Sequence, residues 1–542
     1  MTIKQLFAKF TLFLLTTLVV VTTTGATEDE SIRLPELGSP SDQYLTPSDE
    51  ARLGREFMLT VRKTGHVLDD PQITEYIQQL GDKLLKQSEA VGEKFTFFVI
   101  EKPEINAFAG PGGYIGIYSG LILATQSESE LASVVAHEIA HVTQKHLIRA
   151  FDAANRMSGK TVALIIASIL VGVAGSPDAG IAMATGVQAS AIQKQINFTR
   201  SNEEEADTVG IQILAKSDFD PRSMPVFFER LTHASRLYES GIPEILRTHP
   251  VTTNRLADAL GRAEKYNYRQ FKDNISYYLT REALRVRQFK DSSKAIKHFS
   301  TGLDDGRHLN QEAHKYGYAL ALSANRQYKK AKKIIENILQ QNPSQIEYIL
   351  TSAMIAGEEG NKDKALSILD IYYSLMPENY PLAIAYIDAL TMVKQLGAAR
   401  KITQQTIALR NNEPRLYRML SKIEELDNNQ VESHRMLAEA FVANGELHPA
   451  VQQLEIALNT EGKSNFYQTS KIESRLNKLR DLLKAQEKTD NKRVFDLVKD
   501  FGTSQSTKID SIFDSLLCPD RPAYVRIPYC TSTASCSCTT PS

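Results

Sequence analysis

The chain has 542 residues and is longer than a single ordinary domain, so two or three domains are expected. Its formal net charge is −1, and lysine and arginine are scattered along it, so no nucleic-acid partner is expected. The four cysteines all lie at or beyond Cys518, so the body of the protein is expected to fold without disulfides.

The amino terminus has the pattern of a cleaved signal peptide. Two lysines precede an apolar run over residues 10–21, and small residues then form a cleavage site that ends at Ala26. The alternative is an uncleaved membrane anchor, but the run is shorter than the ~20 residues that a spanning helix usually needs. We therefore expect a signal peptide over 1–26, an exposed lead-in over 27–45 and a mature protein that works outside the cytoplasm.

The next segments predict two helices and two strands. One helix is expected from Pro47 to about Arg62 and another from Pro71, because proline favours the first turn of a helix. β-Branched and aromatic residues predict strands over 95–100 and 114–118, with a Gly-Pro-Gly-Gly turn before the second. The second strand could pair with an extended peptide substrate. The alternative is that it belongs to a plain core hairpin.

The stretch 127–146 contains His137, Glu138 and His141 in an H-E-x-x-H motif. A capping box at Ser127 and an uninterrupted apolar period predict a helix here. Positions i and i+4 share one helix face, so both imidazoles can bind one metal ion, and zinc readily takes neutral histidine nitrogens. Glu138 can then act as general base on a water at the metal. The alternative is an ordinary amphipathic helix with two buried histidines.

A catalytic zinc site needs a third protein ligand and one open position. Glu203 and Asp207 are four residues apart at the start of a predicted helix, so they share a face. Glu203 would bind the metal, and Asp207 would accept a hydrogen bond from a ligand imidazole. The alternative is a solvated acidic first turn that complements the helix dipole, and nothing local separates Glu203 from Glu204.

Two further histidines follow the motif. His146 is nine residues beyond His137, which places it on the opposite face of a continuous helix, so it is not expected to be a ligand. His249 lies in a T-H-P turn, where it could stabilise an oxyanion or act as a transient fourth ligand. A lone histidine in a loop more often does neither.

Two nearly apolar runs, 161–174 and 179–192, lie between the motif and the predicted third ligand. Each run is shorter than a transmembrane helix. We expect a buried helical hairpin that covers the active-site helix. The alternative is a hairpin that touches a membrane or covers substrate.

Residues 271–487 predict an array of helices. Small or turn-forming residues recur there at 34-residue steps: Ala331, Ala365 and Ala399, and Pro343 and Pro377. This is the period of the tetratricopeptide repeat, whose stacked helix pairs form a concave binding surface. We expect the phase to slip around 411–433 and the tail over 488–542 to be disordered. The alternative to partner binding is an array that only shields the catalytic domain.

Four motifs follow one another along the chain: NAFAGPGG at 106–113, HEIAH at 137–141, R-x-x-E-x-x-A-D at 200–207 and THP at 248–250. Together they resemble the gluzincin metallopeptidases of the HtpX and Ste-type clan. The signal peptide and the repeats narrow the resemblance to the BepA-like periplasmic proteases of Gram-negative bacteria, over roughly residues 43–487. The resemblance implies a mainly α protein, with a small β-sheet in a metalloprotease domain over 46–270 followed by the α-solenoid.

The resemblance also implies a zinc site with one ion per chain. The implied zinc ligands are His137, His141 and Glu203. Glu138 is implied as the catalytic base, Asp207 as support for a ligand, and His249 as a regulatory ligand that can close the site.

Members of the family act in outer-membrane protein assembly and quality control. The resemblance therefore implies a periplasmic zinc endopeptidase that degrades stalled or misfolded β-barrel subunits. Its expected partners are unfolded or stalled outer-membrane proteins and, through the repeats, the β-barrel assembly machinery. A peripheral membrane contact through 161–192 is a further alternative. The alternative is a non-proteolytic chaperone or scaffold with a closed metal site.

Overall fold

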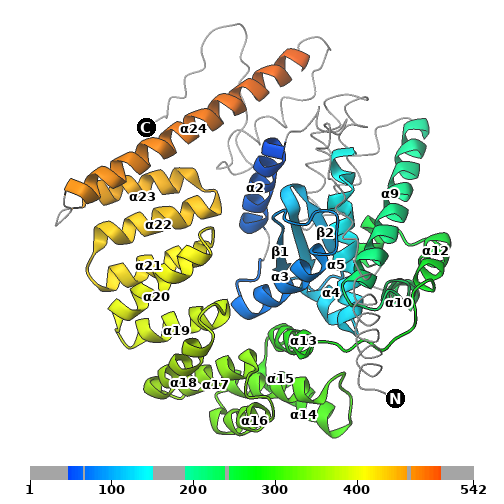
Figure 1. Cartoon of the computed structure of the whole chain (residues 1–542), viewed down its shortest axis with the longest axis horizontal. Helices are drawn as coiled ribbons and strands as arrows, with labels where there is room; N and C mark the ends of the chain where they lie inside the picture. Colours follow the sequence, from blue (N-terminus) through cyan, green and yellow to red (C-terminus); the bar gives the residue numbers. More distant parts are fainter. Residues whose placement is uncertain (1–46, 65–66, 150–188, 238–242, 461–465, 502–542) are drawn as a thin grey trace, which may run out of the picture. The chain divides into compact units, whose positions relative to one another are not determined.

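The structure is a computed structural model (Figure 1). It describes residues 47–64, 67–149, 189–237, 243–460 and 466–501. The predicted signal peptide, the lead-in, the apolar runs up to residue 188 and the cysteine-containing end of the tail lie outside these ranges. Among the described helices, none combines the length and the apolar character needed to cross a membrane.

The described residues separate into two compact units, one up to Glu446 and one from Leu447 onward. The second unit contains α23 (Leu447–Asn459) and α24 (Phe466–Phe501). The boundary predicted at residue 487 falls inside α24, and that helix continues to Phe501 because neither glycine nor proline interrupts it. The boundary predicted at residue 270 lies within the first unit and stays a prediction.

A three-stranded sheet lies at the centre of residues 47–263, the part of the first unit that the sequence predicts to be catalytic and that is called the catalytic part below. Its strands are β1 (Thr96–Ile100), β2 (Ala107–Gly110) and β3 (Tyr114–Tyr118), in the spatial order β1-β3-β2. β3 pairs in parallel with β1 and antiparallel with β2. Gly112, in the turn between β2 and β3, has a φ of 71°, a conformation that favours glycine.

The expectation that strand 114–118 could pair with substrate is wrong. β3 is the central strand, and both of its edges are already paired with neighbouring strands. Among the described strands, none pairs with the outer edge of β2, and the backbone N–H of Ala109 on that edge interacts with the carboxylate of Glu138. β2 is therefore the strand whose unpaired edge lies beside Glu138, the predicted base.

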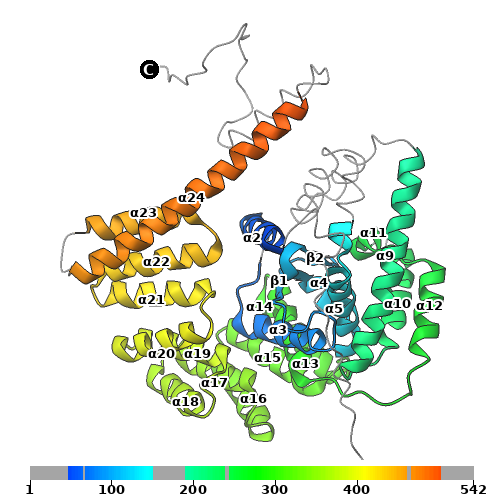
Figure 2. The same cartoon turned by 45° about the horizontal axis from the view of Figure 1, so that its top comes forward.

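Helices surround the sheet. Those of the catalytic part are α2 (Pro47–Thr64), α3 (Pro71–Leu85), α4 (Ser119–Ala124), α5 (Glu128–Thr143), α9 (Ala189–Lys216), α10 (Ser223–Leu237), α11 (Glu244–Thr248) and α12 (Thr253–Ala263). α5 packs along α9, as both views show (Figures 1 and 2), and also contacts α3, α10 and the sheet. Fully buried aliphatic side chains such as Ile77, Val99 and Val135 join these elements in one core, which gives α5 a rigid support.

The predicted starts of three helices are confirmed. α2 begins at Pro47, and α3 follows Asp70, whose side chain accepts hydrogen bonds from the backbone of its first turn. Ser127 caps α5 and accepts from the N–H of Glu130 at 3.2 Å. The reciprocal half of the capping box differs, because the Glu130 carboxylate accepts from the N–H of Gln126 at 2.7 Å.

The remaining helices of the first unit form the repeat array. They are α13 (Ile275–Gln288), α14 (Ser292–Asp304), α15 (Gln311–Ala324), α16 (Tyr328–Gln341), α17 (Ile346–Glu358), α18 (Lys362–Leu375), α19 (Tyr380–Met392), α20 (Leu396–Leu409), α21 (Pro414–Leu426) and α22 (Gln430–Asn444). From α14 to α22 each helix packs on the next in the chain, and α13 packs on α15. The predicted fold class, mainly helical with a small sheet and a helical repeat region, is confirmed.

The predicted slip of the repeat phase around 411–433 is wrong. α16, α18, α20 and α22 begin at 34-residue steps without interruption. Ser433 occupies the position equivalent to Ala399 and is also buried, 8% exposed. Alanine is absent at this step, but serine is small enough to keep the helices close, and its hydroxyl lies 3.1 Å from that of Ser421.

Within the first unit the repeats pack on the catalytic helices. α13 contacts α3 and α4, and α19 contacts α3. Two arginines of the array also reach acidic groups near α3: Arg410 donates to Glu75 at 3.0 Å, and Arg415 donates to Asp69 at 3.0 Å. These ion pairs are partly exposed, so the packed helices rather than the charges provide most of the contact.

Candidate metal centre

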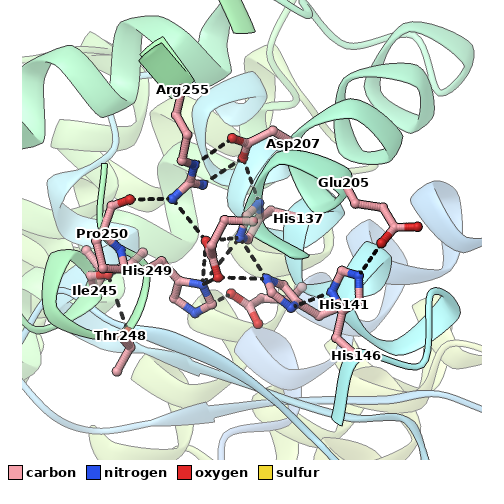
Figure 3. Close-up of polar contacts among 12 residues, drawn as sticks. His137, His141, His146, Glu205, Asp207, Ile245, Thr248, His249, Pro250 and Arg255 are labelled. Carbon is pink, nitrogen blue, oxygen red and sulfur yellow. Dashed lines mark hydrogen bonds and ion pairs between the residues drawn. The ribbon is translucent and has the colours of Figure 1, made fainter. Parts of the chain in front are cut away.

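Three segments bring the predicted site residues together (Figure 3). α5 presents His137 and His141 one helical turn apart, α9 presents Glu203, and His249 follows α11 directly. One donor atom from each of these four residues lies within 4.8 Å of the donors of the other three. The sequence could not separate Glu203 from its neighbour, whereas in the structure Glu203 is buried and Glu204 is exposed.

The distances between the donors match a tetrahedral metal site. Nε2 of His137 lies 3.0 Å from Nε2 of His141 and 3.4 Å from Oε2 of Glu203, and Nε2 of His141 lies 3.5 Å from Oε1 of Glu203. Bonds of ~2.0 Å to a tetrahedral zinc ion separate neighbouring ligand atoms by roughly 3.3 Å. Two imidazoles and one carboxylate are also the donor types that zinc prefers, so these residues fit a zinc ion.

The charges of the cluster favour a cation between its members. Burial raises the pKa of Glu203, but His249 and His137 outweigh burial and hold that pKa well below its ordinary value. Burial lowers the pKa of His137, but contacts with Asp207 and Glu203 outweigh it and raise the pKa to about 10. Burial and the neighbouring His137 push the pKa of His141 well below its usual range. A positive charge is therefore stabilised where a metal ion would be bound.

Glu138 lies beside the cluster and is 1% exposed. Its Oε1 has no hydrogen-bond partner in the described structure and lies 3.5 Å from Nε2 of His249. Burial raises the pKa of this carboxylate, although His249 and His137 lower it. A buried carboxylate oxygen without a partner is costly unless it serves a purpose, and a general base that takes a proton from water needs such an atom.

His249 is the fourth member of the cluster. Its Nδ1 lies 3.0 Å from Oε1 of Glu203 and 3.3 Å from Nε2 of His137. Its backbone N–H donates to the carbonyl of Ile245 at 2.8 Å, and Ile245 in turn donates to the carbonyl of Ile105, just before β2. The short helix α11 is thus tied to the sheet and presents His249 to the cluster.

Arg255 connects the carboxylates of the site and was not anticipated from the sequence. Its Nε and Nη2 donate to Asp207 at 2.8 and 2.9 Å, while Nη1 lies 3.0 Å from Glu203 and donates to the carbonyl of Pro250 at 2.7 Å. Asp207 itself lies 3.0 Å from Nδ1 of His137, on the side of the ring away from the other donors. No local pattern distinguishes this arginine, because its role depends on α12 packing against α9.

The expectation that His146 lies on the opposite helix face is wrong. α5 ends at Thr143, and Lys145 has a φ of 53°, so the chain turns back. The Nδ1 of His146 therefore lies 2.9 Å from Nδ1 of His141. The turn was not predicted because it contains neither glycine nor proline. His146 is not one of the four clustered donors, so it stays outside the ligand set.

Comparison with known proteins agrees with this geometry. Residues 71–263 match the model of peptidase family M48. The β-barrel assembly-enhancing protease of Escherichia coli (strain K12) is 33% identical over 477 residues, covering 86% of this chain and 96% of the relative. The putative β-barrel assembly-enhancing protease of Vibrio cholerae is 39% identical over 323 residues, covering 59% of this chain and 66% of the relative.

A more distant relative matches a smaller share of the chain. The mitochondrial metalloendopeptidase OMA1 of Arabidopsis thaliana is 28% identical over 216 residues, or 40% of this chain and 41% of the relative. Because the match to the Escherichia coli protein runs through both the catalytic part and the repeats, the chain belongs to the β-barrel assembly-enhancing proteases of peptidase family M48 and is a metalloendopeptidase.

Proposed function

We propose that the chain is a zinc-dependent endopeptidase of the bacterial periplasm that acts in outer-membrane protein assembly. The observation that carries the catalytic half of this proposal is the convergence of His137, His141 and Glu203 beside Oε1 of Glu138, which is buried and accepts no hydrogen bond from the described residues. In this assignment one zinc ion is bound by the first three residues, and Glu138 is the general base.

Each residue of the site has a separate role in peptide hydrolysis. When bound, the divalent ion supplies a Lewis acid that polarises a peptide carbonyl and makes water more acidic. Glu138 accepts the proton of the attacking water and returns it to the leaving amine. Asp207 holds the ring of His137 from the opposite side, and Arg255 holds the carboxylates of Asp207 and Glu203 in place.

An extended substrate would pair with the outer edge of β2. The N–H of Ala109 on this edge interacts with Glu138, so a peptide strand added there passes directly beside the base. Main-chain hydrogen bonds would then hold the peptide independently of its side chains. Such pairing suits a protease that acts on unfolded chains of varied sequence.

His249 keeps the site closed until substrate displaces it. With Nδ1 3.0 Å from Oε1 of Glu203 and 3.3 Å from Nε2 of His137, it would fill the coordination position that a catalytic zinc ion leaves open. His249→Ala is therefore expected to raise the rate of cleavage about tenfold, as when a competitor that occupies the site about nine-tenths of the time is removed.

The experiment uses the full chain loaded with zinc and an unfolded β-barrel protein as substrate. His233→Ala is the matched control, because His233 is exposed on α10 and has no contact with the cluster. A chelator is expected to abolish cleavage by every variant. Chelator-resistant cleavage would refute the metalloenzyme, and equal rates for His249→Ala and the control would refute the closing role of His249.

The biological assignment is supported by the relatives. The Escherichia coli and Vibrio cholerae proteins are named for β-barrel assembly, and the signal-peptide pattern fits export across the inner membrane. On this basis the catalytic domain, residues 46–270, degrades stalled or misfolded β-barrel subunits. The repeat domain, residues 271–487, binds those subunits or the assembly machinery through its concave surface.

The closed position of His249 also favours a second candidate function, a chaperone or scaffold that works without proteolysis. A site with four protein ligands resembles a structural zinc site more than a catalytic one. The two functions separate in cells. A Glu138→Gln chain that fully supports outer-membrane assembly favours the chaperone, and one that fails to support it favours the protease.

A further inference from the structure

His146 is buried, 4% exposed, and takes no part in the mechanism above. Its two ring nitrogens nevertheless have defined neighbours, as Figure 3 shows. Nδ1 lies 2.9 Å from Nδ1 of His141, and Nε2 lies 3.1 Å from Oε2 of Glu205. The same oxygen of Glu205 accepts a hydrogen bond from Arg149 at 2.8 Å.

The directions of the hydrogen bonds from Glu205 to His146 and from His146 to His141 follow from the carboxylate of Glu205. A carboxylate such as Glu205 can only accept, so the proton of a neutral His146 lies on Nε2. Its Nδ1 is then an acceptor, and the group opposite it, Nδ1 of His141, must donate. The remaining nitrogen of His141, Nε2, is left without a proton, and this is the atom that faces His137 and Glu203.

This is the tautomer that a metal ligand requires. Imidazole binds a metal through its unprotonated nitrogen. The second ring nitrogen carries the proton, and this N–H usually donates to a carboxylate or carbonyl that fixes the ring. His137 has a carboxylate on that side, since Oδ1 of Asp207 lies 3.0 Å from its Nδ1, whereas among the described residues no carboxylate lies directly behind His141. The turn at Lys145 places His146 in that position instead.

We propose that Glu205 and His146 form a two-step hydrogen-bond relay that holds His141 in its metal-binding tautomer and orientation. His146 is thus a positioning residue, and the inference rests on the metal centre proposed above. Arg149 anchors the outer end of the relay by binding the carboxylate of Glu205. The relay gives His141 the support that Asp207 gives His137.

The test replaces His146 by residues that keep or remove its acceptor. In His146→Asn the amide oxygen takes the place of Nδ1 and can still accept from His141. In His146→Phe the ring volume is kept and the acceptor is lost. The zinc dissociation constant of the full chain, measured by competition with a chelator, is expected to rise about 10- to 100-fold in His146→Phe and to stay close to wild type in His146→Asn.

Two further readouts separate positioning from packing. Long-range ¹H–¹⁵N spectra of the metal-free chain report the tautomer of His141, which should shift from Nδ1–H towards a mixture in His146→Phe only. Melting temperatures of the metal-free variants report packing. His233→Phe, an exposed substitution on α10, is the control and should match wild type in all three measurements.

Each outcome bears on a different claim. Wild-type zinc affinity in His146→Phe would overturn the relay and leave the metal centre intact. Equal weakening in His146→Asn and His146→Phe, with equal losses of melting temperature, would also overturn it, because packing alone would then explain the effect. A wild-type chain that binds no zinc would overturn the metal centre and the relay together.

Discussion

Glu138→Gln is expected to abolish peptide hydrolysis while the chain stays folded and retains its metal. Glutamine has the same shape but cannot accept a proton from water, and the loss of a general base typically lowers the rate by about 10²- to 10⁴-fold. Folding should not suffer, because the substitution removes a buried charge that lies near the ionised Glu203. The metal should remain because Glu138 is not among the clustered donors.

The measurement compares bound zinc and cleavage of an unfolded β-barrel protein by the full-length wild type and variant. Glu204→Gln is a matched control, since Glu204 is exposed on α9 and should leave both quantities unchanged. Cleavage by Glu138→Gln at the wild-type rate would show that the base is another group. Loss of zinc from this variant would show that Glu138 is a ligand instead.

Arg255→Ala is expected to lower the free energy of unfolding by about 3–5 kcal/mol. Arg255 is 2% exposed and neutralises two carboxylates, Asp207 and Glu203, that are themselves almost completely buried. Its removal leaves only the histidines, chiefly His137, to balance these two charges in a medium of low dielectric constant. The carbonyl of Pro250 also loses its donor, so the segment that presents His249 should become less firmly held.

Urea unfolding of the metal-free full chain measures this effect, followed through the transition of the catalytic part. Arg287→Ala is the control, because Arg287 and Glu101 form an exposed pair whose loss should cost less than about 1 kcal/mol. A matching small loss for Arg255→Ala would contradict the claim that the arginine compensates buried charge at the site.

The parts of the site that follow helical periodicity could be predicted from the sequence. The capped apolar period around α5 fixes a helix, and a helix places His137 and His141 on one face. The repeat array could be predicted for the same reason, because each 34-residue step repeats one local unit. Such predictions depend only on residues that are close together in the sequence.

The parts that were wrong or missed depend on tertiary structure. The central place of β3 follows from its parallel pairing with β1, which its own residues do not encode. The return of His146 to α5 depends on one positive φ at Lys145, a residue that gives no signal of a turn. Arg255 acquires its role only because α12 packs on α9, so nothing near it in the sequence marks it.

The central claim is that His137, His141 and Glu203 bind one divalent metal ion beside Glu138. Diffraction from crystals of the full chain, collected on both sides of the zinc absorption edge, tests it most directly. The account predicts one anomalous peak, ~2.0–2.2 Å from Nε2 of both histidines and from a carboxylate oxygen of Glu203, with His249 as a fourth ligand in the closed state. Metal-loaded crystals without a peak there, or with their peak at other residues, would contradict the account.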